Sequence, residues 1–457
     1  MAYRLLRWFL RLVARAFFRQ IEVVGLENVP ADGPVLFAGN HPNSLLDPVL
    51  IITTCGRRVS FAAKDTLFKS RLLRLVLLGL GAVPIARRDD HQGAKKLDND
   101  AAFDAMFALL GAGGAIGIFP EGLSHDESQL ATLKTGAARL ALGAKARVDG
   151  PVRVVPCGLT FIHPARFRSR VLVQYGAPIE VDASWASRAA DDSKTAAREL
   201  TSAIEQGLRA LTVNAPDWET IRALDAVRRL YQPLDIAMED RVELARRFNV
   251  HYGAVKDDPR VVEMMERVRA YQDDIDALDV SDRELARGMT SAQMAGKVAK
   301  YFALLLFWLP LTLPGLPLHI PTILFAQFAG RRLTPRKDVV ATTKVLSGLL
   351  LVLLAYAAVV GASFWKLGWL PAAIAAVVLP LSGYATLQVL DRVKLLVRGV
   401  GALSRRLRFR RAIAALAETR RALARDIVGV VSAVKPADLV PLFARDGADE
   451  QREPRGS

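Results

Sequence analysis

Residues 20–180 alternate between short runs rich in β-branched and aromatic residues and longer stretches whose apolar positions recur at helical spacing. Strands that alternate with helices of about 10 to 15 residues are typical of an α/β fold with a largely parallel central sheet. We therefore predict an α/β domain over 20–182, with helices flanking its sheet. The predicted strands are 21–25, 34–40, 59–63, 82–86, 115–119, 152–161 and 171–176, and the predicted helices are 44–55, 66–79, 95–111 and 129–147.

The first 19 residues place an arginine on almost every turn of a predicted helix. The arginines at 4, 7, 11, 15 and 19 fall within a sector of roughly 120°, and leucines and phenylalanines take much of the other side. A secretory signal needs an uninterrupted apolar stretch, which these arginines exclude. Two interpretations of residues 1–19 stay open: a basic amphipathic helix on a membrane surface, or a surface helix packed on the domain.

The remaining chain divides by composition. Residues 183–300 are dense in charge with apolar positions at helical spacing, which predicts a helical region. Residues 345–364 and 367–390 contain no acidic or basic residue and are long enough to span a hydrocarbon layer of about 30 Å. Residues 301–330 are also uncharged, but four prolines at 310, 314, 317 and 321 predict two short apolar halves.

Charge then orients these segments. The 457 residues carry a formal net charge of +16, which predicts an anionic partner, either nucleic acid or a membrane surface. The basic residues lie beside apolar segments, so we expect membrane lipids and no nucleic acid. Basic residues in 331–337 and after 391 place both stretches in the cytosol.

This orientation predicts a membrane region over 301–390. Residues 345–364 and 367–390 form a spanning hairpin, and 301–330 a re-entrant hairpin. The α/β domain then lies on the cytosolic face of an integral membrane protein, and 391–457 form a basic cytosolic helix and a disordered tail. Two cysteines, Cys55 and Cys157, do not make a disulfide framework, which favours a reducing compartment.

One polar pair interrupts the apolar run after the second predicted strand. The stretch GNHPNSLLDP places His41 at the strand end and Asp47 six positions later, where Asn43 or Ser44 could cap the next helix. Ligand sites of open α/β sheets lie at the carboxyl ends of strands. There Asp47 can accept a hydrogen bond from one imidazole nitrogen, and the other nitrogen can take a proton from a hydroxyl. On spacing alone, a capping aspartate beside a solvated histidine explains the pair at least as well.

A second turn changes that balance. FPEG, residues 119–122, follows the fifth predicted strand, and Lys134 lies near the start of the next helix. Pro120 and Gly122 shape a tight turn whose N–H groups can face an anion. Glu121 can accept a hydrogen bond from a polyol hydroxyl.

Two arginines follow the fourth predicted strand. In GAVPIARR, Arg87 and Arg88 come just after the strand end, where a guanidinium can hold a phosphate with two hydrogen bonds. A solvated strand exit explains them as well. The nearby GLSHD resembles a serine-hydrolase motif only in part, because its last position is Asp126 rather than glycine.

Taken in order, these motifs resemble the glycerophospholipid O-acyltransferase family, which comprises the 1-acylglycerol-3-phosphate and glycerol-3-phosphate acyltransferases. The four motifs are NHPNSLLDP, a glycine and an arginine at 81 and 87, FPEG at 119–122 and VVPCGL at 154–159. The resemblance covers about residues 20–180. Residues 117–142 and 211–231 further resemble the fungal branch that acylates glycerol-3-phosphate or dihydroxyacetone phosphate.

The resemblance implies a role for each matching residue. His41 is expected to be the general base and Asp47 the residue that orients it. Arg87 is expected to bind the phosphate of the acceptor, and Pro156 to line the acyl-donor side. The substrate-binding residues predicted in this way, or as substitutes and neighbours, are Asn40, Ser44, Arg87, Arg88, Glu121, Gly122, Ser124, Lys134 and Pro156.

Two departures from the family pattern stand out. Five residues separate His41 from Asp47, where four are usual. Ser124 stands where an arginine is common, two positions after the FPEG glycine, so Arg88 or Lys134 is expected to substitute in phosphate binding.

The implied function is a membrane-bound O-acyltransferase that moves a fatty acyl group from acyl-CoA or acyl carrier protein to a hydroxyl of glycerol-3-phosphate or 1-acylglycerol-3-phosphate. It implies no covalent acyl-enzyme, no cofactor and no metal. The alternative is a non-enzymatic membrane scaffold or lipid-binding protein. That alternative accounts for the apolar segments but not for four motifs in order.

Overall fold

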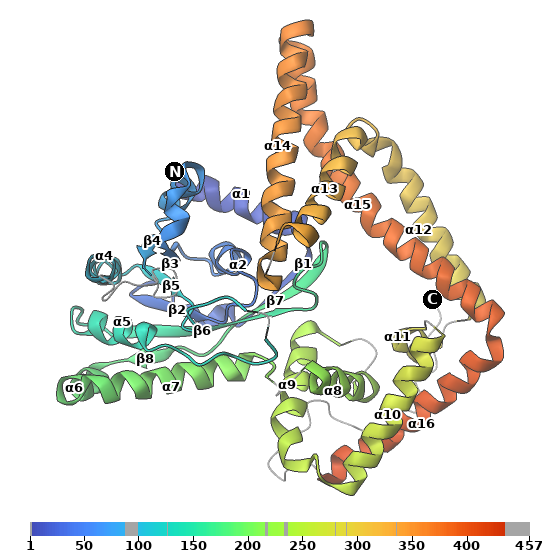
Figure 1. Cartoon of the computed structure of the whole chain (residues 1–457), viewed down its shortest axis with the longest axis horizontal. Helices are drawn as coiled ribbons and strands as arrows, with labels where there is room; N and C mark the ends of the chain where they lie inside the picture. Colours follow the sequence, from blue (N-terminus) through green and yellow to red (C-terminus); the bar gives the residue numbers. More distant parts are fainter. Residues whose placement is uncertain are drawn as a thin grey trace. The chain divides into compact units, whose positions relative to one another are not determined.

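The computed structural model describes residues 2–86, 99–125, 127–214, 218–232, 236–278, 280–288, 290–334 and 336–434 (Figure 1). The chain divides into two compact units. The first comprises 1–212 and 294–400, and the second 213–293 and 401–457.

The first unit is built on an eight-stranded sheet that confirms the predicted α/β class. Its order is β1-β7-β6-β2-β5-β3-β4, with β8 also paired to β6. All pairs are parallel except β6–β7 and β6–β8. The strands are β1 Phe18–Val24, β2 Val35–Gly39, β3 Val59–Lys64, β4 Val83–Ile85, β5 Ala115–Ile118, β6 Val152–Phe161, β7 Ser169–Tyr175 and β8 Ile179–Val181. The sequence pattern missed β8, a strand of three residues.

Helices cover both faces of this sheet. Along β2, Val35 and Phe37 face one core, and Leu36 and Ala38 face the other, and all four are fully buried. Burial on both faces explains why the parallel strands read as continuous apolar runs. The first core includes α1 Ala2–Phe17 and α2 Leu46–Thr54, and the second α4 Asp100–Gly111, α5 Gly136–Lys145 and α7 Ser193–Leu211. The shorter η1 Leu26–Asn28, η2 Asp65–Lys69 and α3 Arg71–Gly79 connect strands.

Helix α1 has two apolar stripes. Tyr3 and Phe17 are buried against the domain, so the helix is packed as the second interpretation of its sequence predicted. Leu5, Trp8 and Leu12 form another stripe, and they are 67%, 57% and 45% exposed. An exposed leucine and tryptophan stripe among arginines suits a lipid surface, so the membrane-surface role stays a prediction.

Residues 183–300 are helical from their first residues, as predicted, but the first two helices do not belong to a separate helical region. α6 Ala183–Asp191 and α7 belong to the first unit, because Leu200, Ile204 and Leu208 of α7 are buried in the second core of the sheet. The second unit has a core of its own, where Asp282 accepts hydrogen bonds from Tyr271 Oη (2.9 Å) and Arg420 Nε (2.9 Å). Its helices are α8 Trp218–Tyr231, α9 Met238–Val255, α10 Pro259–Ala277, α11 Asp282–Arg287 and α16 Arg410–Val434.

Long apolar helices make up the rest of the first unit. Among the described residues, three stretches are long and apolar enough to cross a membrane: Ser291–Thr312, Lys337–Leu367 and Trp369–Arg408. Large apolar side chains on them are exposed, among them Phe307 (67%) and Trp365 (82%), which indicates contact with lipid. The elements are α12 Ser291–Thr312, α13 Leu316–Arg332, η4 Lys337–Val339, α14 Val340–Leu367 and α15 Trp369–Arg408.

Residues 301–330 fall into two helical halves, as their prolines predicted. Pro310 and Pro321 lie inside α12 and α13, and the chain breaks only at 313–315. Neighbouring helices satisfy the groups near that break. Gly315 N–H donates to Ser382 Oγ (2.9 Å), and Ser382 Oγ donates to the Thr312 carbonyl (2.9 Å). Whether 301–330 re-enters or spans the bilayer stays a prediction.

Candidate active site

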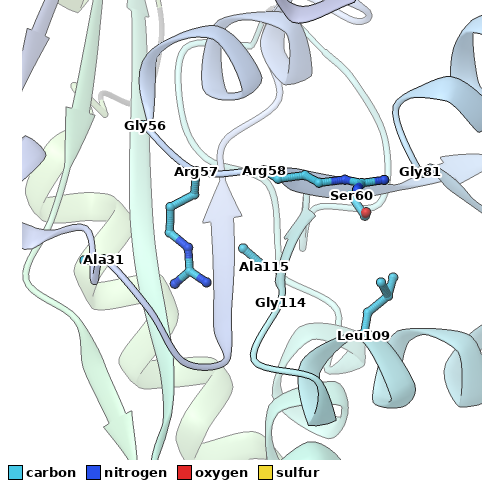
Figure 2. A pocket seen from close by; sticks show the side chains of 9 residues that line it. All are labelled: Ala31, Gly56, Arg57, Arg58, Ser60, Gly81, Leu109, Gly114 and Ala115. Atoms are coloured by element: carbon cyan, nitrogen blue, oxygen red, sulfur yellow. The ribbon is translucent and has the colours of Figure 1, made fainter. Parts of the chain in front are cut away.

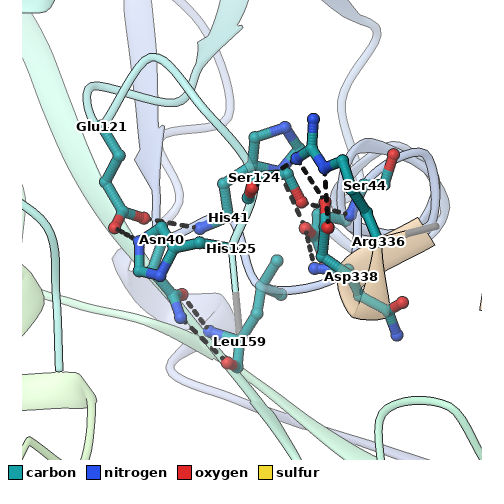
Figure 3. Close-up of polar contacts among 11 residues, drawn as sticks. Asn40, His41, Ser44, Glu121, Ser124, His125, Leu159, Arg336 and Asp338 are labelled. Atoms are coloured by element: carbon teal, nitrogen blue, oxygen red, sulfur yellow. Dashed lines mark hydrogen bonds and ion pairs between the residues drawn. The ribbon is translucent and has the colours of Figure 1, made fainter. Parts of the chain in front are cut away.

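The site lies where two neighbouring parallel strands end. His41 follows β2, Glu121 follows β5, and β2 pairs with β5 in register from Val35 to Ala38. Carboxyl ends of adjacent parallel strands meet at one edge of the sheet, so the two motifs lie side by side. Figure 3 shows the residues from both turns pointing toward one another.

His41 and Asp47 form a buried pair, which we call the dyad. His41 Nδ1 lies 2.8 Å from Asp47 Oδ2, and the same oxygen accepts the Asn43 backbone N–H at 2.7 Å. His41 is 8% exposed and Asp47 fully buried. The extra residue between them is absorbed by the turn, because Ser44 adopts a left-handed φ of 49° and α2 begins only at Leu46.

The suggested capping of α2 is wrong. Its N-cap residue is Leu45, with no side-chain hydrogen bond, and the Asn43 side chain instead donates to the Pro164 carbonyl at 3.2 Å. Asp47 lies in the first turn of the helix. Its carboxylate is therefore held by the turn and by His41 and does not cap the helix.

The far side of the imidazole is available. The His41 ring stacks on Phe119, with centroids 4.0 Å apart and 5° between planes, which fixes its orientation. Among the residues that the structure describes, none makes a hydrogen bond with His41 Nε2. Burial raises the pKa of the Asp47 carboxyl, although its hydrogen bond with His41 lowers it in part, and its Oδ1 is buried without a partner.

Glu121 has both oxygens engaged by the protein. Oε1 accepts the His41 backbone N–H (2.8 Å), and Oε2 accepts the Ala131 N–H (2.9 Å) and contacts His125 Nε2. The residue is 2% exposed. The geometry therefore favours positioning of the His41 turn over the predicted contact with a substrate hydroxyl. His125, to which the sequence analysis gave no role, is part of this group.

The other residues of the FPEG turn surround its backbone. Gly122 has a φ of 74°, and a Cβ there would come within 2.8 Å of Lys134 Nζ, so the lysine side chain lies against this glycine. The Gly122 N–H donates to the Phe119 carbonyl (3.0 Å), which closes the turn and leaves that N–H unavailable to an anion. Ser124 Oγ accepts the Ser44 N–H at 3.0 Å and thereby links the two turns.

Two predicted residues lie away from the open side of the dyad. The Asn40 side chain is bonded twice to Leu159 of β6, accepting its N–H (2.7 Å) and donating to its carbonyl (3.1 Å). Pro156 pairs with Ala38 and is buried against Gly207 of α7, on the face of the sheet opposite α2. The alternation of side chains along β6 explains this placement, and it argues against an acyl-donor contact.

Arg87 and Arg88 lie outside the described residues. The structure instead brings Arg336, from the loop between α13 and α14, onto the FPEG turn, where its Nη2 donates to the Ser124 carbonyl at 2.7 Å. Sequence reasoning missed this residue, because no local pattern signals a contact between positions 212 apart.

A cavity of about 460 Å³ lies at the opposite edge of the sheet (Figure 2). Gly114 and Ala115, at the start of β5, line it together with Arg57. Arg57 donates to four backbone carbonyls in this edge, at 2.9 to 3.0 Å. Its guanidinium thus holds neighbouring loops together. The cavity does not adjoin the dyad.

Two family models match the chain. Residues 20–160 match the acyltransferase family model, and residues 223–439 match the model of the glycerol-3-phosphate acyltransferase 2 C-terminal domain. Together the two matches take in most of the chain.

Three curated relatives are similar to parts of it. Glycerol-3-phosphate O-acyltransferase 2 of Saccharomyces cerevisiae is 33% identical over 58% of this chain and 38% of the relative. Glycerol-3-phosphate O-acyltransferase 1 of the same yeast is 25% identical over 76% and 59%. The 1-acyl-sn-glycerol-3-phosphate acyltransferase of Borreliella burgdorferi is 30% identical over 27% and 46%. The chain spans less than two thirds of the length of each.

The fold and the site, with these matches, define a protein of the acyltransferase class. The chain resembles the glycerophospholipid O-acyltransferase family, and its similarity to the two yeast enzymes supports the fungal-like glycerol-3-phosphate acyltransferase branch. The family predicted from the four motifs is confirmed.

Proposed function

We propose that the protein transfers a fatty acyl group from an acyl thioester to a hydroxyl of glycerol-3-phosphate, with His41 as general base. One observation carries the proposal: a buried imidazole held by Asp47 at 2.8 Å, with its other nitrogen unpartnered among the described residues, at the carboxyl end of a parallel strand. The similarity to two yeast glycerol-3-phosphate O-acyltransferases supports this acceptor.

In the proposed reaction, His41 Nε2 takes the proton of the acceptor hydroxyl as its oxygen attacks the thioester carbonyl. A carbon–oxygen bond forms, the carbon–sulfur bond breaks, and the thiolate of coenzyme A or acyl carrier protein leaves. The imidazolium returns the proton to that thiolate. Asp47 keeps Nδ1 protonated and stabilises the imidazolium.

Direct transfer without an acyl-enzyme is supported by the neighbouring side chains. Among the described residues, no serine or cysteine is bonded to His41 Nε2. Burial raises the pKa of both thiols, Cys55 and Cys157, which disfavours a thiolate nucleophile. Ser124 Oγ is occupied by the Ser44 N–H.

We assign the other site residues by their contacts. The side chains of Asn40, Glu121 and Ser124 position the two turns through hydrogen bonds to backbone groups, and Ser44 takes part through its own backbone N–H. Lys134, exposed against Gly122, is free to attract the acceptor phosphate. Arg87 and Arg88 remain predicted phosphate ligands. The apolar helices and the basic flanks of 331–337 and 391–411 favour a site on the cytosolic membrane face.

The proposal is tested by offering three acceptors in parallel to membranes that contain the full chain. Glycerol-3-phosphate, dihydroxyacetone phosphate and 1-acylglycerol-3-phosphate are each incubated with labelled acyl-CoA or acyl carrier protein. We expect the label in 1-acylglycerol-3-phosphate formed from glycerol-3-phosphate. Product from 1-acylglycerol-3-phosphate alone would move the protein to the second acylation, and no product from any acceptor would favour the scaffold alternative.

A further inference from the structure

The loop between two membrane-region helices reaches the active-site turn. α13 ends at Arg332, η4 begins at Lys337, and between them the Arg336 guanidinium donates from Nη2 to the Ser124 carbonyl at 2.7 Å. Figure 3 shows this arginine entering the site from an element distant in sequence. Since position 124 lies two residues past the FPEG glycine, a membrane-region cation sits at the turn that carries the acceptor-side motif.

Several further contacts attach α14 and α15 to the α/β domain near Arg336. Lys344 Nζ of α14 donates to the Ala165 carbonyl at 2.7 Å, and Ala341 is fully buried in the core that contains α2. Asp391 of α15 accepts two hydrogen bonds from Arg168 Nε, one to each oxygen at 3.2 Å. Arg336 is therefore held by helices that pack against the catalytic domain, and its position does not depend on one surface contact.

The Arg336 guanidinium has one fixed side and one exposed side. Nε donates to Asp338 Oδ1 (3.1 Å) and Nη2 to Asp338 Oδ2 (2.8 Å). The Asp338 side chain is only 5% exposed, whereas that of Arg336 is 60% exposed. Among the residues that the structure describes, none accepts a hydrogen bond from Nη1. An oriented guanidinium with an unpartnered, solvent-facing N–H₂ group suits a phosphate oxygen.

Arg336 is also connected to the dyad through two short links. Ser124 Oγ accepts the Ser44 N–H (3.0 Å), and Ser44 lies between His41 and Asp47. The next residue, His125, donates its backbone N–H to the His41 carbonyl at 3.2 Å. A phosphate held by Arg336 would thus lie beside the turn that presents the base.

We propose that Arg336 binds the acceptor phosphate, so that the membrane region supplies a residue of the acceptor site. The proposal rests on the proposed function. It accounts for Ser124 at a position where an arginine is common in the family, because Arg336 places a guanidinium on that same residue. A latch, meaning an arginine that only holds the loop to the FPEG turn, would need the Ser124 contact but not the exposed Nη1.

The test uses full-length protein in membranes, with Arg336→Ala, Arg336→Lys and the control Lys337→Ala. Lys337 is the adjacent exposed cation, so its removal changes the same charge without the guanidinium. We expect Arg336→Ala to raise the KM for glycerol-3-phosphate about 10- to 100-fold, the range for losing a charge-assisted hydrogen bond. We expect kcat and the KM for the acyl donor to change less than about threefold.

Inorganic phosphate should compete with the acceptor, and its inhibition constant should rise by the same factor as the KM. Arg336→Lys should fall between, and Lys337→Ala should match the wild type within about twofold.

Two results would overturn the proposal. One is an unchanged acceptor KM and phosphate inhibition constant in Arg336→Ala. The other is a fall in kcat with both constants unchanged, which identifies a latch. Calorimetric binding of glycerol-3-phosphate to His41→Ala, with and without Arg336→Ala, separates this inference from the proposed function, because it needs no turnover. Binding that Arg336→Ala weakens supports the inference even if no acceptor is acylated, and equal binding by both proteins contradicts it.

Discussion

Two histidine–carboxylate pairs lie on adjacent turns of the active site, and they differ in which hydrogen-bonding atoms are left without a partner. Asp47 is fully buried and Glu121 is 2% exposed, and each contacts one histidine. His41 uses only Nδ1 and keeps Nε2 without a partner among the described residues. His125 uses both nitrogens, Nε2 with Glu121 and Nδ1 with the Glu127 N–H (3.2 Å).

The carboxylates differ in the same way. Glu121 accepts two backbone N–H groups besides its histidine, whereas Asp47 accepts one and keeps Oδ1 unpaired. A pair whose hydrogen-bonding atoms all have partners holds a loop in place. A pair that keeps a nitrogen and an oxygen without partners can also exchange a proton. Residue type alone does not distinguish a histidine that acts as a base from one that holds a loop in place. The number of hydrogen-bonding atoms left without a partner does distinguish them. Substituting each residue of the two pairs measures how much the two roles differ.

The largest effect is expected from His41→Ala. General-base assistance contributes about 10²–10⁴-fold, so we expect kcat to fall by up to about 10⁴-fold. The measurement is transfer of labelled acyl groups by membranes with matched protein content. Membrane association and the thermal unfolding midpoint serve as controls and should stay close to the wild type. Full transfer by this variant would exclude the dyad mechanism.

Asp47→Asn should have the second-largest effect. The amide keeps the size of the carboxylate but loses the charge that stabilises the imidazolium, so we expect kcat to fall about 10²-fold with acceptor KM within about threefold. Steady-state kinetics on glycerol-3-phosphate measure both. A rise in acceptor KM without loss of kcat would assign Asp47 to binding instead.

The same variant should be more stable than the wild type at neutral pH. Burial raises the pKa of Asp47 in the folded protein above its ordinary value of 3.8, so the unfolded chain ionises first as pH rises, and stability falls. The asparagine side chain of the variant cannot ionise and avoids that loss. Thermal unfolding at neutral pH and below pH 3.8 should show a higher midpoint for Asp47→Asn that disappears in acid. A lower midpoint at neutral pH contradicts this electrostatic account.

The dyad itself could be predicted from sequence, because strand ends, a nearby helix and six-residue spacing all act locally. Roles that depend on long-range packing could not. Glu121 was expected to meet substrate, but its oxygens face the His41 and Ala131 N–H groups. Pro156 was expected at the donor side, but the pairing with Ala38 turns it toward α7.

The same limit applies to the fold. Seven of the eight strands follow from their β-rich runs, while the assignment of α7 to the catalytic domain depends on which surface its stripe of Leu200, Ile204 and Leu208 buries. Arg336 shows the limit most clearly. Its sequence neighbours mark only a basic loop, and its place on Ser124 follows from the docking of α14 on the domain.

Glu121→Gln tests directly whether the Glu121 carboxylate holds the His41 turn in place. A glutamine NH₂ must face either the His41 or the Ala131 N–H, so one buried donor loses its acceptor, at a cost of about 1–3 kcal/mol. We expect a lower thermal unfolding midpoint and a kcat reduced about 10-fold, because the His41 turn shifts. A raised acceptor KM with an unchanged midpoint would instead restore the substrate contact that the sequence predicted.

The smallest effect is expected from His125→Gln. Glutamine keeps a donor for Glu121, and the two backbone N–H groups still hold that carboxylate, so we expect kcat and acceptor KM to stay within about threefold of the wild type. Kinetics measured beside His41→Ala make the comparison direct, since each variant removes one imidazole from a buried carboxylate. A loss from His125→Gln as large as that from His41→Ala would show that the second histidine takes part in proton transfer, and that hydrogen-bond saturation does not distinguish the two pairs.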